Sequence, residues 1–187
     1  MERARLTGRR DGGALVRTGY GLPEAAVSVP TRYDRAFFEE LADATCASAD
    51  AVAPLLVDLV RPASVLDVGC GTGTWLAAFR RLGIEDVFGI DGGEITPSML
   101  EIPAACFARA DLSRPFDLGR RFDLALCLEV GEHLPAGAAD ALVGSLTAHA
   151  PVVAFSAAIP FQGGAGHVNE QWPGWWAARF AERGFEA

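Results

Sequence analysis

The chain has 187 residues, of which half are apolar and 21% are charged, a composition typical of a globular protein with enough chain for one domain and its core. Its formal net charge of −8 argues against a general affinity for nucleic-acid phosphates. No apolar run approaches the roughly 20 residues of a membrane-spanning helix, and the four cysteines form no Cys-x-x-Cys pair typical of a zinc ribbon. We therefore expect a cytoplasmic protein with reduced thiols and no membrane contact.

The first 30 residues are rich in glycine and arginine, and they contain neither a clear period nor an apolar signal core. They predict a flexible arm at 1–30, followed by one domain at 31–187. Helical spacing of apolar residues then predicts two helices, at 33–46 and 50–60, and Pro62 separates the second helix from the next element.

Short apolar segments alternate with helical patterns along the rest of the chain. This alternation indicates a doubly wound, mostly parallel α/β sheet with helices on both faces, a three-layer αβα architecture. The predicted strands lie at 65–68, 87–91, 105–108, 122–128 and 152–157, and the predicted helices lie at 75–82, 136–149 and 173–183.

The most informative segment is 65–73, which reads Val-Leu-Asp-Val-Gly-Cys-Gly-Thr-Gly. Glycines at the carboxyl end of a strand let the chain turn sharply and bring a ligand close to bare backbone, as nucleotide-like ligands require. The spacing differs from the Gly-x-Gly-x-x-Gly of dinucleotide-binding domains, and Asp67 would repel a pyrophosphate. An acid at this place suits a ligand that carries a cation.

This segment resembles the first motif of class I S-adenosylmethionine-dependent methyltransferases. The resemblance implies a Rossmann-like fold and S-adenosylmethionine as the cofactor, with Asp67 near its methionine amino group and the glycines packed beside it. It covers the chain from Tyr33 to the end. In that family a pair of antiparallel strands follows the last helix, whereas this chain stops at about that point, so we expect a C-terminally short domain without those strands.

Two further acids follow predicted strands. Asp91 can accept hydrogen bonds from both hydroxyls of a ribose. The resemblance implies that Asp111 accepts a hydrogen bond from the adenine amine and that Leu112 lies beside the adenine ring. The alternatives are a turn residue for Asp91 and a cap for Asp111, and Trp75 either contacts the cofactor or lies under the sheet. The expected cofactor-binding residues are Asp67, Gly69, Cys70, Gly71, Gly73, Thr74, Trp75, Asp91, Gly92, Asp111, Leu112, Leu128 and Glu129.

The segment 128–134, Leu-Glu-Val-Gly-Glu-His-Leu, resembles the corresponding segment of small-molecule O-methyltransferases of the quinone-biosynthesis type. His133 is a candidate general base for a hydroxyl, because an imidazole titrates near neutral pH. The alternative is a turn that only shapes the cofactor pocket. The run also resembles the magnesium-binding segment of RNA 3′-end 2′-O-methyltransferases, so Glu129, Glu132, His133 and His167 are candidate ligands of a divalent ion that would acidify a hydroxyl. Methyltransferases without a metal contain this run too.

A loop rich in glycine and polar residues follows the fifth predicted strand, at 162–173. Its position predicts a lid or an acceptor site, with His167 as a second candidate catalytic residue, although a capped entry to the last helix is the alternative. The pattern resembles a group of small bacterial methyltransferase domains. The expected substrate-binding residues are Asn169, Glu170, Gln171 and Trp172.

These observations predict a methyltransferase that moves a methyl group from S-adenosylmethionine to a small-molecule acceptor, preferably a hydroxyl. The sulfonium is an activated donor, so the protein mainly supplies proximity and alignment. Three alternatives remain: a metal-assisted RNA 2′-O-methyltransferase, which the acidic charge opposes, a catalytically inactive binding module, and a nicotinamide enzyme.

Overall fold

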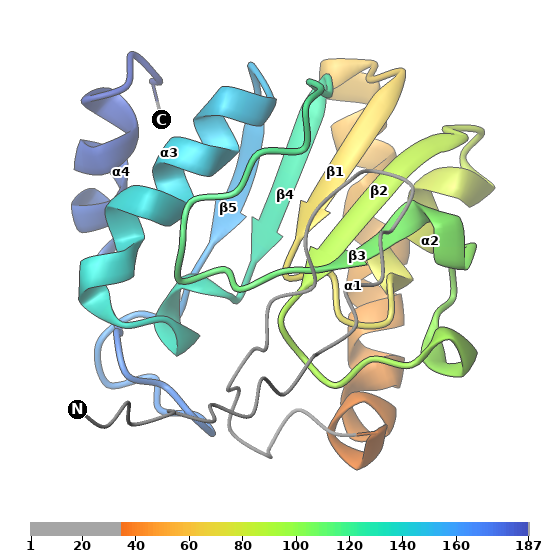
Figure 1. Cartoon of the computed structure of the whole chain (residues 1–187), viewed down its shortest axis with the longest axis horizontal. Coiled ribbons are helices and arrows are strands. Elements are labelled where there is room, and N and C mark those ends of the chain that lie inside the picture. The colour runs from red at the N-terminus through yellow and green to blue at the C-terminus, as the bar shows by residue number, and fades with distance from the viewer. Residues whose placement is uncertain (1–34, 187) are drawn as a thin grey trace, which may run out of the picture.

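The computed structural model describes residues 35–186, so the predicted arm at 1–30 lies outside the described residues. One five-stranded sheet has the strand order β3-β2-β1-β4-β5, and every neighbouring pair is parallel (Figure 1). The strands are β1 (Ser64–Val68), β2 (Asp86–Asp91), β3 (Phe107–Arg109), β4 (Leu124–Leu128) and β5 (Val153–Ser156). The helices are α1 (Arg35–Val60), α2 (Thr74–Arg81), α3 (Ala139–His149) and α4 (Pro173–Ala181), with 3-10 turns at Pro97–Met99, Ala104–Cys106, Gly131–His133 and Ala136–Ala138.

The strand order confirms the doubly wound parallel sheet that the alternation of strands and helices predicted. The chain runs outward from β1 through β2 to β3, and then returns to build β4 and β5 on the other side of β1. The order therefore reverses between β1 and β4, and the crevice at the carboxyl ends of such neighbouring strands is where open α/β sheets bind ligands.

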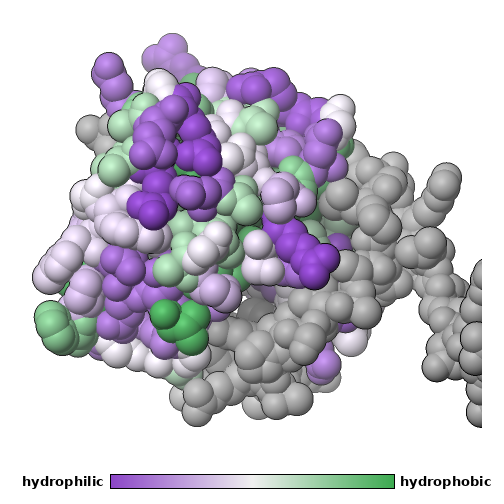
Figure 2. Space-filling view, turned by 60° about the vertical axis from the view of Figure 1, so that its left-hand side comes forward, coloured by the Kyte–Doolittle hydropathy of each residue, from purple (hydrophilic) through white to green (hydrophobic). Residues whose placement is uncertain are grey.

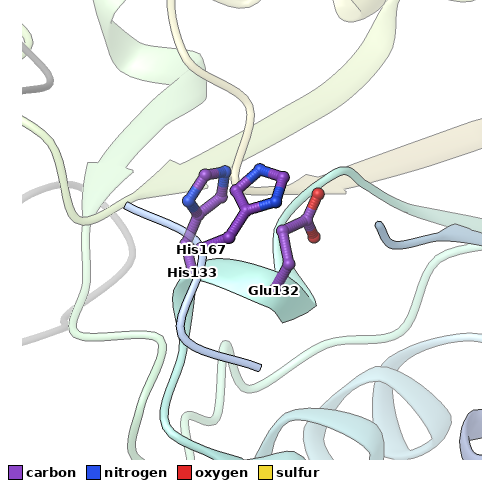
Figure 3. A group of neighbouring side chains, drawn as sticks. All are labelled: Glu132, His133 and His167. Carbon is purple, nitrogen blue, oxygen red and sulfur yellow. The ribbon is translucent and has the colours of Figure 1, made fainter. Parts of the chain in front are cut away.

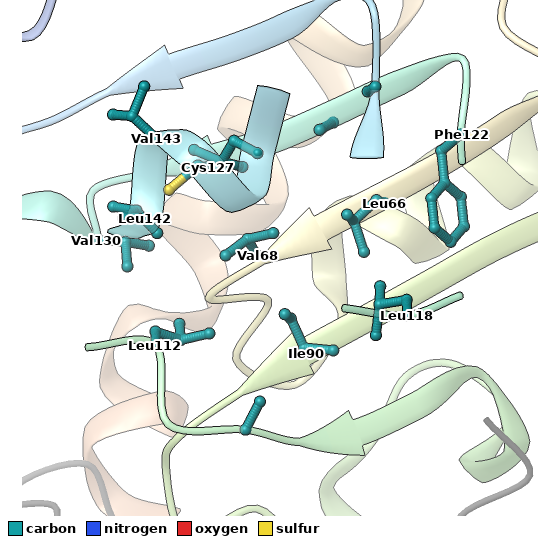
Figure 4. Close-up of a cluster of buried hydrophobic side chains, with 14 of the residues drawn as sticks. Leu66, Val68, Ile90, Leu112, Leu118, Phe122, Cys127, Val130, Leu142 and Val143 are labelled. Carbon is teal, nitrogen blue, oxygen red and sulfur yellow. The ribbon is translucent and has the colours of Figure 1, made fainter. Parts of the chain in front are cut away.

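Two hydrophobic clusters cover the two faces of the sheet. Successive strand residues point to opposite faces, so Leu124 and Leu126 join the cluster of α1 and α2, while Ala125 and Cys127 join the cluster of α3 and α4. In Figure 1, α1 lies behind the strands. Figure 4 shows the second cluster, in which Leu142 of α3 is close to the sheet. Burial on both faces explains why the strands read as continuous apolar runs.

The N-terminal helical region differs from the prediction, because α1 is one continuous helix from Arg35 to Val60 instead of two helices at 33–46 and 50–60. The stretch between the two predicted helices contains neither glycine nor proline. Ala49 and Ala53 are both fully buried against the sheet, so burial continues across the predicted break. Pro54 lies inside the helix without ending it.

His149 fastens the end of α3 to the loop that precedes β4. Its ring is almost fully buried, and its Nδ1 lies 2.7 Å from the carbonyl oxygen of Ser145. Its Nε2 accepts a hydrogen bond of 2.9 Å from the backbone N–H of Leu118. The two contacts fix the neutral tautomer that carries its proton on Nδ1.

Replacing His149 tests this structural role. We expect His149→Leu to lower the free energy of unfolding by about 1–3 kcal/mol, because the buried N–H of Leu118 loses its acceptor. Urea unfolding followed by circular dichroism measures the change. The control Asp117→Asn removes the exposed charge 3.7 Å from Nε2, and we expect it to change stability by less than about 0.5 kcal/mol. Equal midpoints for His149→Leu and the wild type would contradict the role.

Candidate active site

The glycine loop after β1 depends on backbone conformations that favour glycine. Gly69, Gly71 and Gly73 have φ angles of 84°, 54° and 86°. At Gly69 space matters as well, because an added Cβ would lie 2.3 Å from a methyl carbon of Val130. The loop after β1 and the segment after β4 are therefore in direct contact, across the point where the strand order reverses.

Asp67 lies inside β1 and is 2% exposed. Its Oδ2 atom is buried without a hydrogen-bond partner. Burial, and then the negative charge of Asp91, raise the pKa of Asp67 to about 8. A buried carboxyl group with an unpaired oxygen favours a ligand that brings a hydrogen-bond donor or a positive charge.

Asp91 ends β2 and holds the glycine loop. One carboxylate oxygen accepts a hydrogen bond of 2.8 Å from the N–H of Gly71, and the other accepts one of 2.6 Å from the N–H of Gly93. Burial raises the pKa of Asp91, and the amide donors oppose this rise. Each oxygen keeps further acceptor capacity, as a ribose diol would require.

Asp111 follows β3 at the same edge of the sheet and takes part in a local turn. Its Oδ1 accepts hydrogen bonds from the N–H of Ser113 at 3.0 Å and from its hydroxyl at 2.6 Å. These contacts correspond to the turn or cap that was the alternative for this acid. Leu112 is buried in the core, and the half-buried Trp75 packs against the cluster of α1 and α2.

The remaining expected cofactor residues lie at the ends of the same strands. The thiol of Cys70 is buried, and burial, followed by the charges of Asp67 and Asp91, raises its pKa. Thr74 is buried and donates its hydroxyl hydrogen bond to Glu101. Gly92 and Leu128 are half-buried, and Glu129 is exposed with a φ of 56°.

Sequence reasoning missed Glu101 as a support of the glycine loop. Its carboxylate accepts hydrogen bonds from the hydroxyls of Thr72 and Thr74, and its N–H donates to the carbonyl of Thr72. Glu101 lies in an irregular connection after β2, where no hydrophobic period or motif singles it out.

A second polar group lies beyond the Val130 contact and consists of Glu132, His133 and His167 (Figure 3). Glu132 and His133 come from the 3-10 turn after β4, and His167 comes from the loop between β5 and α4. One ligand atom from each of the three residues lies within 4.8 Å of the others. The two imidazole rings meet edge to face, with centroids 5.0 Å apart. The structure thus brings together three of the four candidate metal ligands, while Glu129 is outside this group.

The loop between β5 and α4 is bonded to this turn through its backbone. The N–H groups of Val168 and Asn169 both donate to the carbonyl oxygen of Glu132, at 2.8 and 3.1 Å. The side-chain amide of Asn169, which is 3% exposed, donates to the carbonyl of Gly131 at 3.2 Å and accepts a hydrogen bond from Gln171. Asn169, predicted to bind substrate, is therefore a buried support of the loop.

Glu170 organises the other half of the loop. Its carboxylate accepts hydrogen bonds from the N–H groups of Phe161 and Gly163, and it lies 2.9 Å from Nδ1 of His167. The hydrogen bond with His167 is the main cause that lowers the pKa of Glu170. Of the four residues predicted to bind substrate, Trp172 is the most exposed, at 57%.

Burial is the main influence on the protonation of His133 and Glu132 at neutral pH. Burial, followed by the charge of His167, lowers the pKa of His133, while the carbonyl of Gly166 and the charge of Glu129 oppose this change. Burial is also the main cause that raises the pKa of Glu132 to about 7, and the neighbouring Glu129 acts in the same direction. His133 is therefore largely a neutral imidazole at pH 7, the form that accepts a proton or a metal ion.

Exposed apolar side chains are also present in this loop. They are Ile159, Phe161, Val168 and Trp172, and Phe161 is 95% exposed with a φ of 74°. Figure 2 shows that most of this side of the molecule is polar, and that its strongly hydrophobic surface residues are few and lie toward the lower part of the view. Large exposed apolar groups beside polar reactive ones are typical of a binding surface.

Comparisons with known proteins agree with this geometry. A family model described as a methyltransferase domain matches residues 37–186. The crystal structure of DesVI from Streptomyces venezuelae is 27% identical, with a TM-score of 0.54 over 71% of this chain and 61% of that one. This chain thus spans less than two thirds of the length of DesVI. A search of curated proteins gave no significant match.

Two more distant structures share the fold. Magnesium protoporphyrin IX methyltransferase (ChlM) from Synechocystis PCC 6803 with bound SAH is 19% identical, with a TM-score of 0.60 over 86% of this chain and 81% of that one. A SAM-dependent methyltransferase from Archaeoglobus fulgidus is 17% identical, with a TM-score of 0.64 over 82% and 75% of the two chains. Within the described residues, no helix is both long enough and apolar enough to cross a membrane. The cytoplasmic location stays a prediction.

The buried carboxyl group of Asp67 predicts a pH dependence of stability. Its folded-state pKa of about 8 lies above its ordinary value, so the folded protein retains a proton that the unfolded chain loses. Its contribution to stability is therefore present at low pH and is lost as the pH rises from about 4 to about 8. We expect Asp67→Asn, which cannot ionise, to show a weaker decline and to exceed the wild type in stability above about pH 8.

Urea unfolding at several pH values across this window measures the difference. Asp58→Asn is the matched control, because Asp58 is exposed on α1 and its replacement leaves the pH profile of the wild type unchanged. Parallel profiles for Asp67→Asn and the wild type would show that Asp67 is already ionised in the folded state.

Proposed function

We propose that this chain, which belongs to the methyltransferase-domain family and is a class I S-adenosylmethionine-dependent methyltransferase, transfers the methyl group to the hydroxyl group of a small molecule. The observation that carries this proposal is the position of two neighbouring imidazoles, those of His133 and His167, at the edge of the sheet that holds Asp67 and Asp91. The contact between Gly69 and Val130 joins the two groups of residues.

The residues at the ends of β1, β2 and β3 fit the cofactor. We assign the amino group of S-adenosylmethionine to the unpaired oxygen of Asp67, because a buried acid favours a cation. The carboxylate of Asp91 would bind the ribose hydroxyls, and Asp111 with Leu112 would border the adenine. The bound cofactor supplies a methyl group on a positively charged sulfur, which needs alignment more than activation.

The pair of imidazoles favours a hydroxyl acceptor over an amine. A neutral amine attacks a methyl sulfonium without help from a base, whereas a hydroxyl becomes a good nucleophile only as it loses its proton. His133 is half-buried and His167 is held by Glu170 at 2.9 Å. We propose that this group of residues removes the hydroxyl proton, with the carboxylate of Glu132 stabilising the positive charge that results.

The loop between β5 and α4 supports a small acceptor with an apolar or aromatic body. Its exposed Phe161 and Trp172 offer apolar surface beside His167, and Phe161 keeps a strained backbone conformation while fully exposed. Strain of this kind persists where the surroundings hold it and is concentrated at functional sites. Residues 157–172 contain neither lysine nor arginine, so the loop is poorly suited to the phosphates of the RNA substrate that was the alternative.

Titration of S-adenosylhomocysteine into the purified chain tests the cofactor site. We expect calorimetry to give a dissociation constant in the micromolar range for the wild type. Asp91→Ala removes the ribose acceptor and both bonds to the glycine loop, so we expect it to weaken binding at least about tenfold, or about 1.4 kcal/mol. Asp86→Ala is the control, because Asp86 lies at the opposite end of the same strand. No binding by folded wild type would refute the cofactor site.

A panel of acceptors tests whether the methylated atom is the oxygen of a hydroxyl or the nitrogen of an amine. We expect methyl transfer from labelled S-adenosylmethionine to phenols or alcohols with apolar bodies, and little transfer to matched amines. Phe161→Ser would raise the KM for the acceptor and leave S-adenosylhomocysteine affinity unchanged, because the aromatic ring is exposed on the loop. Transfer only to amines, identified by mass spectrometry of the products, would overturn the hydroxyl assignment.

A further inference from the structure

We propose that Glu101 is a specificity-determining residue of the cofactor site, whose carboxylate selects against cofactors that place a phosphate at the glycine loop. This carboxylate is bound at the amino end of α2, and the amino end of the corresponding helix is where dinucleotide-binding domains hold a pyrophosphate. The role rests on the cofactor site of the proposed function and is independent of the acceptor.

The segment that carries Glu101 is fastened directly to the glycine loop. The backbone N–H of Glu101 donates a hydrogen bond of 2.8 Å to the carbonyl oxygen of Thr72. The next side chain, that of Ile102, is buried against Gly73, where an added Cβ would lie 2.9 Å from a carbon of Ile102. The position of Glu101 is therefore defined by a backbone bond and by the packing of its neighbour.

The carboxylate itself binds two hydroxyls of the loop. Its Oε1 accepts hydrogen bonds from the hydroxyl of Thr72, at 3.1 Å, and from the hydroxyl of Thr74, the first residue of α2. Thr74 is buried while Glu101 is exposed, so these bonds hold a surface charge against the buried start of the helix. Asp91 holds Gly71 of the same loop through its N–H.

The amino end of α2 has no other source of negative charge among its own residues. The helix has no acid in its first turn and no side-chain cap. The first N–H groups of a helix, together with its dipole, attract anions. Glu101 lies 27 residues beyond Thr74 in the sequence and supplies a negative charge there. Within the described residues, no arginine forms an ion pair with it.

This charge separates cofactor classes by their own charge. A pyrophosphate at the loop would face carboxylates from three segments that border it, those of Asp67, Asp91 and Glu101, and like charges a few ångströms apart repel each other even in water. S-adenosylmethionine has no phosphate and is positively charged at its sulfur and its amino group. Asp67 and Asp91 also have proposed contacts with the cofactor, whereas Glu101 has none, and exclusion of phosphates gives its charge a role.

Calorimetry with S-adenosylhomocysteine and with ADP tests this role, because the two ligands share adenosine and differ in the group attached to it. We expect the wild type to bind ADP at least about 100-fold more weakly than S-adenosylhomocysteine. Glu101→Gln keeps the size of the side chain and an acceptor oxygen but removes the charge. It would bind ADP about three- to tenfold more tightly than the wild type does, without a gain for S-adenosylhomocysteine. The gain for ADP would shrink as salt is raised from about 0.05 to about 0.5 M.

Glu182→Gln is the matched control, because it removes the same charge from an exposed residue at the end of α4. We expect it to leave the ratio of the two dissociation constants within about twofold of the wild type. Thr74→Val keeps the charge but releases the carboxylate from the helix, so it would lower the ratio in the same direction by a smaller factor. Circular dichroism checks that each variant is folded.

Two results would overturn the role of Glu101. One is an unchanged ratio in Glu101→Gln, and the other is equal weakening of both ligands without salt dependence, which would show that Glu101 only stabilises the loop. In both cases the wild type still binds S-adenosylhomocysteine. A folded wild type that does not bind it would reject the cofactor site itself, and this result distinguishes the two failures.

Discussion

The close approach of Gly69 to Val130 is the constraint on which the rest of the site depends. β1 and β4 are parallel neighbours, so the loops that leave them must occupy the same crevice. A side chain at Gly69 would overlap Val130, and hence the absence of one lets the turn after β4 lie directly against the glycine loop. This contact places the group of Glu132, His133 and His167 beside the acids at the ends of β1 and β2. A methyl donor and an acceptor can be aligned only if their two sites are neighbours.

Two carboxyl groups of this region, those of Asp67 and Glu132, are buried, and one oxygen of Asp67 has no hydrogen-bond partner. Both act on the thiol of Cys127, whose pKa is raised by burial and then by the charges of these two groups. Burying such groups destabilises the free protein, because water no longer solvates them. A fold that retains them favours ligands that bring positive charge, and the free energy lost on folding is then recovered on binding.

The alternation of strands and helices and the acids at the strand ends could be predicted because their signals are local. A glycine turn after an apolar run, and an acid after each of the next two strands, are visible in the residues themselves. The continuity of α1 could not be predicted, since the burial of Ala49 and Ala53 depends on a sheet formed by distant residues. In the loop before α4, a polar sequence indicated exposed binding groups, but Asn169 and Glu170 instead satisfy backbone groups whose positions only the folded chain defines.

The site therefore divides into parts that can change independently. The residues proposed to bind the cofactor lie at the ends of β1, β2 and β3, where the sheet and the glycine loop fix them. The loop between β5 and α4 carries His167 together with Phe161 and Trp172, and it is joined to the turn after β4 by the carbonyl of Glu132. Substitutions at the exposed apolar positions would alter the proposed acceptor surface without disturbing Glu170 or Asn169, which hold His167 and the turn after β4 in place. Reactive and recognition residues thus share one loop on a rigid scaffold, an arrangement that allows one fold to serve different acceptors.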